Sequence, residues 1–263
     1  MPKRDDILTE LGLVPTWRLR GDAGAAAPAK PQSAVQPERD ARAALRDDTA
    51  GPRSAGAAPD AASSGRAQRI ATLEWRDFAA DVDACTACGL ARSRKKSVPG
   101  VGDTRAEWLF VGEAPGSEED AKGEPFVGQA GRLLDNMLAA LAMKRGANVY
   151  IANVLKCRPP NNRAPAPREI DACRPYLDRQ IALIRPKLIV ALGKSAATTL
   201  LGVDATIASL RGRVHRYRDV PLVVTYHPAY LLRSLPDKAK AWEDLLFARR
   251  TLEAAADAVP GGR

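Results

Sequence analysis

The sequence predicts an α/β fold in which a largely parallel β-sheet is covered by helices on both faces. Short apolar runs alternate along the chain with longer segments of helical periodicity. This unit of a buried strand followed by a helix occurs four times. Repeated strand–helix units favour a parallel sheet, because the helix that returns the chain to the next strand packs on the sheet.

Four apolar runs of four or five residues are the expected strands. They cover residues 108–111, 149–152, 188–192 and 222–226. Each run ends at a glycine or a polar residue, where a turn can leave the sheet. The residues that follow the runs are Gly112, Asn153, Gly193 and His227. Because ligands gather at the carboxyl ends of parallel strands, we expect the functional site at these positions.

A helix is expected after each strand. The first spans about 130–144, where leucine and methionine side chains share one face and Gly146 is the expected C-cap. The second begins near Pro167, since proline suits the first turn of a helix. The third begins near Ser195, and the fourth covers about 237–256.

Composition divides the chain into three parts. Residues 21–68 are rich in alanine, lack aromatic side chains and have Val35 and Leu45 as their large aliphatic residues, so we expect a disordered linker there. The folded domain is then expected at 69–258, and residues 1–20 form a separate peptide.

The charge of the chain is strongly basic. There are 40 Lys and Arg against 31 Asp and Glu, which gives a formal net charge of +9. The linker contains as many acidic as basic residues, so nearly all of the excess belongs to the folded domain. Such a balance suits a polyanionic partner.

The sequence also bears on the cellular compartment. No apolar run approaches the ~18 residues that a bilayer span requires, which excludes a membrane protein. Residues 1–6 lack the apolar core of a secretory signal. Four cysteines are too few for a disulfide-stapled scaffold of this length, so we expect a cytoplasmic protein with reduced thiols.

The four cysteines are candidate metal ligands. Cys85 and Cys88 form a C-x2-C pair, and Cys157 and Cys173 complete a set of four sulfurs with none left over. The alternative is four unrelated buried thiols, since cysteine is also a small hydrophobic residue. Tetrahedral zinc and an iron–sulfur cluster both remain open on this pattern.

Three polar side chains at the strand ends are candidate functional residues. Glu113 begins a turn rich in carboxylates, the amide of Asn153 can both donate and accept, and His227 stands beside a turn fixed by proline. Each also has an ordinary interpretation, as part of a strand-to-helix connection, a turn or a structural histidine. The other histidine, His215, lies among arginines and receives no catalytic role.

Together these segments resemble the family 4 uracil-DNA glycosylases, the iron–sulfur branch of the uracil-DNA glycosylase superfamily. The resemblance spans about residues 70–255. It rests on the cysteine pair followed in order by the segments GEAPGSEED, GEPFVGQAGRLLD, NVLKCRPPNNR, ALGKSAA and HPAYLLR. It implies a three-layer α/β/α sandwich with a four-stranded, mostly parallel sheet. It also implies a [4Fe-4S] cluster held by Cys85, Cys88, Cys157 and Cys173.

The resemblance further implies an activity and a set of site residues. The enzyme would flip uracil out of single- or double-stranded DNA and hydrolyse its N-glycosidic bond, leaving an abasic site. Phe126 would stack on the uracil, Asn153 would hydrogen-bond its polar edge, and neutral His227 would donate to O2. The backbone lining of the pocket would come from Gly112, Ala114 and Gly116.

One position departs from the best-known uracil glycosylases. They carry an acid that orients the attacking water where this chain has Ala114. Family 4 members share this lack, so Glu113, Glu119 and Asp120 are the candidates, with Glu113 preferred. A related branch traps the sugar covalently through a histidine in a basic inserted loop. No such loop occurs between Asn153 and Cys173, which favours a monofunctional enzyme with ordinary turnover.

Several further residues are expected to contact DNA. Tyr230, Leu231 or Leu232 would fill the gap left by the flipped base, and Arg233 would hold a phosphate. Lys194 and the basic run Arg92, Arg94, Lys95 and Lys96 are further phosphate contacts.

Residues 1–20 look like the N-terminal peptide of the psi subunit of bacterial replicative clamp loaders. They combine an apolar stripe and Trp17 with the long linker that follows, which is typical of a docking peptide. An N-terminal helix that packs on the domain is the alternative. We expect a monomer that acts on nucleoid DNA in bacteria.

Two other functions are considered. The first is a non-catalytic DNA-binding module that contains a metal or cluster. The second is a phosphate-ligand α/β enzyme that uses the Gly112 turn, which the missing P-loop lysine disfavours.

Overall fold

The computed structural model describes residues 61–257. The expected docking peptide at 1–20 and residues 21–60 of the expected linker lie outside this range. The linker was expected to reach residue 68, but helix α2 (Ala61–Ala71) already begins within it. Its buried Ile70 packs with residues of α3 (Trp75–Ala84) and α6 (Pro167–Ile184), so this helix belongs to the folded domain.

The sheet contains the four expected parallel strands and two further strands that we did not expect. Its order is β1-β3-β2-β4-β6-β5. The parallel centre consists of β2 (Trp108–Gly112), β3 (Val149–Asn153), β4 (Leu188–Leu192) and β6 (Val220–Thr225). Antiparallel edge strands β1 (Val101–Gly102) and β5 (His215–Tyr217) complete it. The expectation of a four-stranded sheet was therefore wrong in number, because these edges are short and lack an apolar run.

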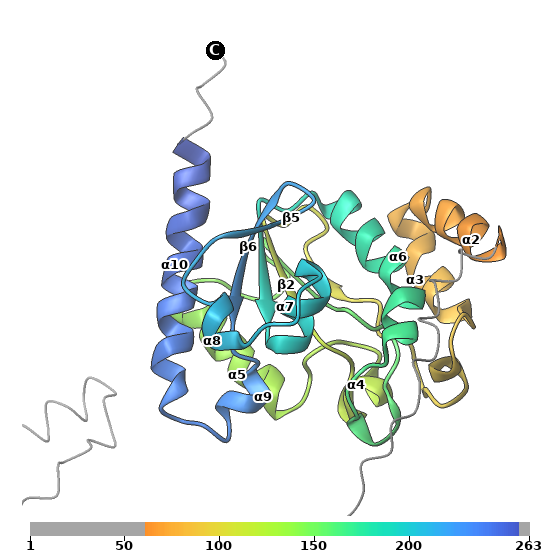
Figure 1. The fold of residues 1–263 in the computed structure, drawn as a ribbon, viewed down its shortest axis with the longest axis horizontal. Coiled ribbons are helices and arrows are strands. Elements are labelled where there is room, and N and C mark those ends of the chain that lie inside the picture. Colours follow the sequence, from red (N-terminus) through yellow and green to blue (C-terminus); the bar gives the residue numbers. More distant parts are fainter. Residues whose placement is uncertain (1–60, 258–263) are drawn as a thin grey trace, which may run out of the picture. The chain divides into compact units, whose positions relative to one another are not determined.

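Helices cover both faces of the sheet, as the α/β prediction requires (Figure 1). Successive residues of each central strand point to opposite faces. On one face the strands pack against α6 and α7 (Lys194–Leu201). On the other face they pack against α5 (Gln129–Ala140) and α10 (Asp237–Asp257). Helix α5 is shorter than expected, because the chain turns at Ala142 with a φ of 58° before it reaches Gly146.

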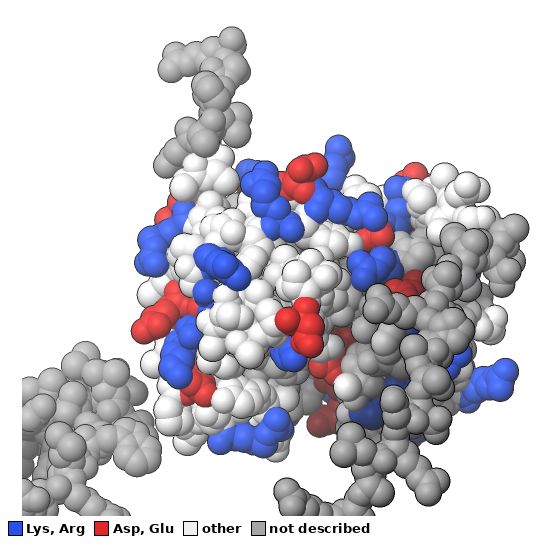
Figure 2. Space-filling model, in the orientation of Figure 1, with Lys and Arg blue, Asp and Glu red and all other residues white. Residues whose placement is uncertain are grey.

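Short helices line the carboxyl edge of the sheet or connect its strands. They are α4 (Ser117–Lys122), α8 (Ile207–Leu210), α9 (Pro228–Leu231) and the 3-10 turns Gly89–Arg92 and Pro160–Asn162. No helix in the described part of the chain is both long and apolar enough to cross a bilayer. On the face drawn in Figure 2, basic side chains are spread over the surface with acidic side chains between them.

The strand register places the expected site residues at one edge. Gly112 at the end of β2 pairs with Asn153 at the end of β3. Leu192 of β4 pairs with Thr225 of β6, and Gly193 donates its N–H to the Thr225 carbonyl. The chain leaves all four strands at this edge, so the loops that follow them can converge.

Candidate active site

A cavity of about 450 Å³, here called the rim cavity, opens at the carboxyl edge of the parallel strands. It unites segments that follow β2, β3 and β6. Its lining residues are Glu113, Ala114, Pro115, Gly116, Glu119, Phe126, Ala130, Asn153, Pro159, Asn162, Arg163, His227, Ala229 and Arg233. The lining residues that we did not predict from the sequence are Ala130, Pro159, Asn162, Arg163 and Ala229, because nothing in their types marks them as lining a cavity.

Phe126 and His227 face each other across this cavity. Their ring centroids lie 5.5 Å apart with an angle of 30° between the planes. Gly193, which has a φ of +91°, lets the His227 loop approach β4, because a Cβ at this glycine would lie 2.9 Å from the Cβ of His227. The expected pairing of Phe126 with His227 in one cavity is confirmed.

The protonation state of His227 follows from its contacts. Its Nδ1 accepts a hydrogen bond from the Ala229 N–H at 3.1 Å, so the proton of the neutral ring is on Nε2. Burial lowers the pKa of His227 to about 4, and the positive charge of Arg233 contributes in the same direction. The imidazole is therefore neutral near pH 7 and has one N–H left to donate.

Asn153 has an unsatisfied polar atom. The side chain is 2% exposed, and its Oδ1 accepts no hydrogen bond in the structure. Buried amide oxygens are rarely left without a donor, so the atom is suited to a ligand. Gly112 makes room for this arrangement, because a Cβ there would overlap Asn153 Oδ1 and lie 2.6 Å from the Phe126 ring.

Phe126 adopts a backbone conformation that is rare for an aromatic residue. Its φ is +54°, in the left-handed region. Two groups hold the strained loop. Arg145 donates to the carbonyl oxygens of Pro125 and Phe126 at 2.7 and 2.8 Å and is itself paired with Asp135. Gly131 brings the first turn of α5 so close that a Cβ would overlap the Phe126 carbonyl.

Glu119 shapes the cavity through its backbone contacts. One carboxylate oxygen accepts from the N–H groups of Val127 and Gly128 at 2.9 and 3.2 Å, and the other accepts from Gly116 at 3.0 Å. The side chain thereby joins the two loops that follow β2. We had considered Glu119 as a group that activates water, but these three bonds occupy both of its oxygens.

The other two carboxylates differ in their surroundings. Asp120 is 2% exposed, accepts from the Lys95 N–H and is not part of the cavity lining, so it is no candidate for contact with a ligand. Glu113 lines the cavity and is half-buried. Burial raises its pKa, and a hydrogen bond with Ser195 opposes this shift. It stays the preferred acceptor for a water molecule, beside Ala114 in the same lining.

The expected DNA contacts separate into exposed and buried groups. Tyr230 and Leu232 are 39% and 40% exposed beside the cavity, and Arg233 lines it. Leu231 is 1% exposed, so the expectation that it contacts DNA is wrong. The short helix α9 turns this leucine inward, toward α5.

Two expected phosphate contacts are engaged elsewhere. Lys194 is exposed but forms an ion pair with Asp204 at 2.9 Å and is absent from the cavity lining. Arg94 belongs to the basic run that was expected to face DNA. It points instead toward the cysteines and donates to Cys157 Sγ at 3.0 Å.

The four cysteines lie around a second pocket, here called the cysteine pocket. Cys85 and Cys88 come from the segment after α3, Cys157 follows β3, and Cys173 lies on α6. All four are free thiols. Although burial raises the pKa of Cys85, its backbone contact with Ala87 and the hydrogen bond from Arg66 outweigh this and lower it.

The donor set of the cysteine pocket consists of four cysteine sulfurs. Within residues 61–257, no group of three or more His, Cys, Asp or Glu side chains is placed so that it could hold a metal ion. A tetrahedral zinc site needs four sulfurs about 2.3 Å from one point. An iron–sulfur cluster likewise takes cysteine thiolates as ligands.

Comparison with known proteins identifies the family. The model of the uracil DNA glycosylase superfamily matches residues 99–246, which is more than half of the chain. This range includes the residues of the rim cavity, whereas Cys85 and Cys88 precede it.

Curated relatives agree with this match. The chain is 46% identical over 164 residues to the type-4 uracil-DNA glycosylase of Archaeoglobus fulgidus, covering 59% of this chain and 82% of that protein. It is 45% identical over 155 residues to the type-4 enzyme of Thermotoga maritima, covering 58% and 80%. Identity to a type-5 enzyme of Pyrobaculum aerophilum is 31% over 154 residues, covering 52% and 67%. On the family match and these relatives, the chain belongs to the uracil-DNA glycosylase superfamily.

Proposed function

We propose that the protein excises uracil from DNA by hydrolysing the bond between the base and the deoxyribose, as a DNA repair glycosylase. Relatives that are 42–46% identical to this chain are named type-4 uracil-DNA glycosylases. The observation that carries the proposal is the rim cavity, in which Phe126, Asn153 and His227 meet. One aromatic face, one amide and one neutral N–H donor are the groups that recognition of a flipped pyrimidine requires.

Base recognition uses the Phe126 ring and the Asn153 amide. The extruded uracil stacks on Phe126, which the Glu119 and Arg145 contacts hold in place. The unpaired Oδ1 of Asn153 accepts from the uracil N3–H, while its NH₂ group donates to O4. This pairing excludes cytosine, which presents an acceptor and a donor at the corresponding positions.

His227 stabilises the charge that develops on the leaving base. As the glycosidic bond lengthens, negative charge collects on uracil O2 and positive charge on the sugar. The Nε2–H donor is fixed by the Ala229 contact, so it is oriented before the reaction begins. Such preorganised donors are worth roughly 10²–10³ in rate. Glu113, half-buried in the same lining, accepts a proton from the water that attacks the sugar.

Release of free uracil from a single-stranded oligonucleotide tests this function. His227→Ala should lower the single-turnover rate by roughly 10²-fold or more, and Asn153→Ala should lower it by about 10-fold or more. His215→Ala is the matched control, because His215 lies on β5 and its Nε2 contacts the Leu210 carbonyl. Equal, measurable rates for the wild type and all three variants would exclude His227 and Asn153 from catalysis. No uracil release by the wild type would favour the non-catalytic DNA-binding module, which no observation now supports.

We also propose that the cysteine pocket holds a [4Fe-4S] cluster through Cys85, Cys88, Cys157 and Cys173. The four free thiols around one pocket and the basic side chains beside them support this. The cluster would cross-link the segment after α3 to the segment after β3 and to α6. Iron and acid-labile sulfide in protein purified without oxygen would support the cluster. One equivalent of zinc in a colourless protein would show instead that the four cysteines hold zinc.

Two partner assignments complete the proposal. The protein would act as a monomer on uracil in single- and double-stranded nucleoid DNA of the bacterial cytoplasm. Residues 1–20 would recruit it to the replicative clamp loader, where misincorporated uracil first arises. A pull-down with clamp-loader subunits should lose its signal when residues 1–20 are deleted, and an unchanged signal would remove this assignment.

A further inference from the structure

The cysteine pocket is bordered by cationic groups that form no ion pair with a carboxylate in the described part of the chain. Arg66 donates to Cys85 Sγ at 3.3 Å and Arg94 donates to Cys157 Sγ at 3.0 Å. Lys156, which is 1% exposed, presents its backbone N–H to Cys173 Sγ at 3.3 Å. Within the described residues, none of these three side chains forms an ion pair with Asp or Glu.

Buried or half-buried cations require an anion nearby. A lysine that is removed from water without a counter-charge costs several kcal/mol. The Nζ of Lys156 donates to the Asn153 carbonyl and to Gln180 Oε1, which are neutral acceptors. Asp83 lies close enough to Arg94 to interact with it, but the anionic groups that all three cations share are the sulfurs of the pocket. Four thiolates around a metal centre carry net negative charge, so the cations and the centre balance each other.

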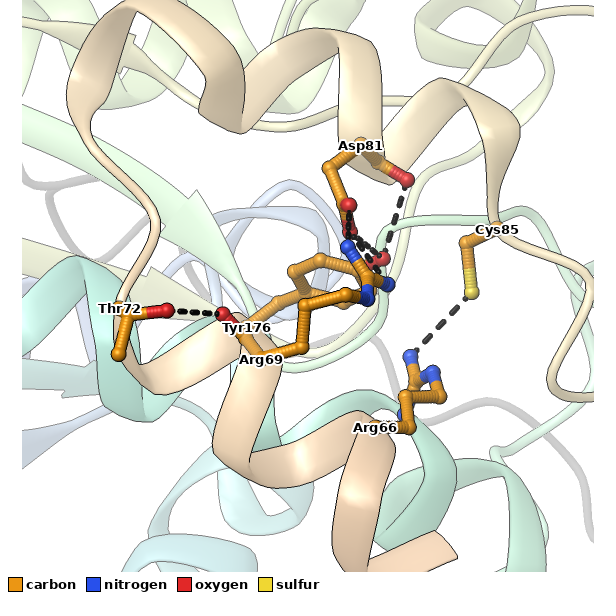
Figure 3. Close-up of polar contacts among 6 residues, drawn as sticks. All are labelled: Arg66, Arg69, Thr72, Asp81, Cys85 and Tyr176. Carbon is orange, nitrogen blue, oxygen red and sulfur yellow. Dashed lines mark hydrogen bonds and ion pairs between the residues drawn. The ribbon is translucent and has the colours of Figure 1, made fainter. Parts of the chain in front are cut away.

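Arg66 is held in this position by α6. Its Nη1 donates to the Ala172 carbonyl at 2.9 Å, next to Cys173, and its guanidinium lies over the Tyr176 ring at 5.1 Å from the centroid. Tyr176 is fixed in turn by a 2.6 Å hydrogen bond to Asp81 Oδ1, and Asp81 pairs with Arg69 of α2. Figure 3 shows this arrangement, with the Arg66 side chain pointing at the sulfur of Cys85.

Helix α2 lies outside the segment that the superfamily shares. The family model begins at residue 99, whereas Arg66 and Arg69 precede it. The contacts of α2 with α6 nevertheless place Arg66 directly at the cysteine pocket. Helix α2 thus contributes a guanidinium group that contacts one of the cysteines.

We propose that Arg66 is a positioning residue of the metal centre, which balances the charge of the Cys85 thiolate and, together with α2, closes the centre against solvent. Arg94 does the same at Cys157. The inference rests on the proposed four-cysteine centre. It assigns no part in the excision chemistry to either arginine, because both lie outside the lining of the rim cavity.

Loss of the cluster from the full chain tests the inference. Wild type, Arg66→Gln and Arg66→Lys are purified without oxygen, and iron and sulfide per chain are measured. The decay of visible absorbance is then followed in air with an iron chelator. Arg66→Gln keeps a hydrogen-bond donor but loses the charge. The variant should lose iron roughly 10-fold faster than the wild type, because mutation of a residue that contacts a metal ligand commonly weakens metal binding by about this factor. Arg66→Lys should recover part of the lifetime.

Arg76→Gln is the matched control. Arg76 lies on α3, is 84% exposed and pairs with its neighbour Asp77. It should lose iron at the wild-type rate, and circular dichroism establishes that each variant is folded. Decay of Arg66→Gln at the Arg76→Gln rate overturns the role of Arg66. Wild-type protein without bound metal overturns the proposed centre itself, while uracil release from the same preparations reports separately on the excision activity.

Discussion

The ring of Phe126 lies 5.5 Å from the imidazole of His227, although the two residues are a hundred positions apart in the chain. One ring follows β2 and the other follows β6, so the pair exists only because both strands end at the same edge of the sheet. In the proposed function, the uracil stacks on Phe126 while His227 donates to its edge. Substitutions in and around this pair have predictable effects.

Gly193→Ala should lower excision by displacing His227. The new Cβ would lie 2.9 Å from His227 Cβ, and displacement of a catalytic donor by about 1 Å can cost roughly 10²-fold in rate. Gly202→Ala is the control, because Gly202 also has a positive φ, of 67°, but its Cβ would meet no atom within 4 Å. Single-turnover rates should fall for the first variant far more than for the second, and equal losses would contradict the displacement.

The pH dependence of excision should separate Glu113 from His227. His227 stays neutral down to a pKa of about 4, whereas burial raises the pKa of Glu113. We expect acid to reduce the wild-type rate through protonation of Glu113 first. Glu113→Gln should be slow and should lack this acidic limb at pH values above the His227 pKa of about 4. A variant whose rate still falls with acid as the wild type does would exclude Glu113 as the base.

His227 should also couple folding to pH. Its pKa in the folded protein, about 4, lies below the ordinary value of 6.5, so the unfolded chain binds the proton more tightly. This contribution therefore lowers the free energy of unfolding as pH falls from 6.5 toward 4. His227→Gln removes the titrating group. Urea denaturation of the variant should show a smaller loss of stability across that window than the wild type shows.

Arg145→Ala should impair base stacking without unfolding the domain. The substitution removes the donors to the Pro125 and Phe126 carbonyls, which hold the strained φ of +54° at Phe126. The loss of hydrogen bonds from a charged donor predicts a drop in kcat/KM of about 10-fold or more. Arg145→Lys should rescue little, because lysine lacks the fork that reaches both oxygens. Arg132→Ala, at an exposed position on α5, should have the wild-type kcat/KM.

Leu231 and Leu232 should have opposite phenotypes. Leu231 is 1% exposed, so Leu231→Ala should cost about 2–5 kcal/mol of unfolding free energy. Leu232 is 40% exposed beside the rim cavity, so Leu232→Ala should leave stability unchanged and slow excision from duplex DNA more than from single strands. Chemical denaturation and excision assays on both substrates measure the two effects. The reverse pattern would contradict the inward orientation of Leu231.

This pair also shows what the sequence could and could not predict. The central strands and the edge at which Asn153 and His227 lie follow from apolar runs that end in polar turns. Helix α9, in contrast, is only four residues long, and so short a segment has no periodicity that tells which leucine faces inward.

The contacts of Arg66, Arg94 and Glu119 could not be predicted from the sequence either. Arg66 lies in a stretch whose composition indicates a linker. Ile70 is the one large apolar residue near it that is buried, and a single apolar residue is too little to predict a packed helix. Arg94 stands in a run of basic residues, which suggests a solvated face. Glu119 sits among other carboxylates, and only the folded loops show which one receives three backbone N–H groups.

The register partnership of Gly112 and Asn153 has a consequence for heat resistance. Asn153, whose amide is proposed to select the base, is the last residue of β3 and is paired with β2. No loop separates it from the hydrogen bonds between these two strands. Warming can loosen the surface long before it moves this group. Base selectivity should consequently persist up to the melting transition and vanish with it in a single step.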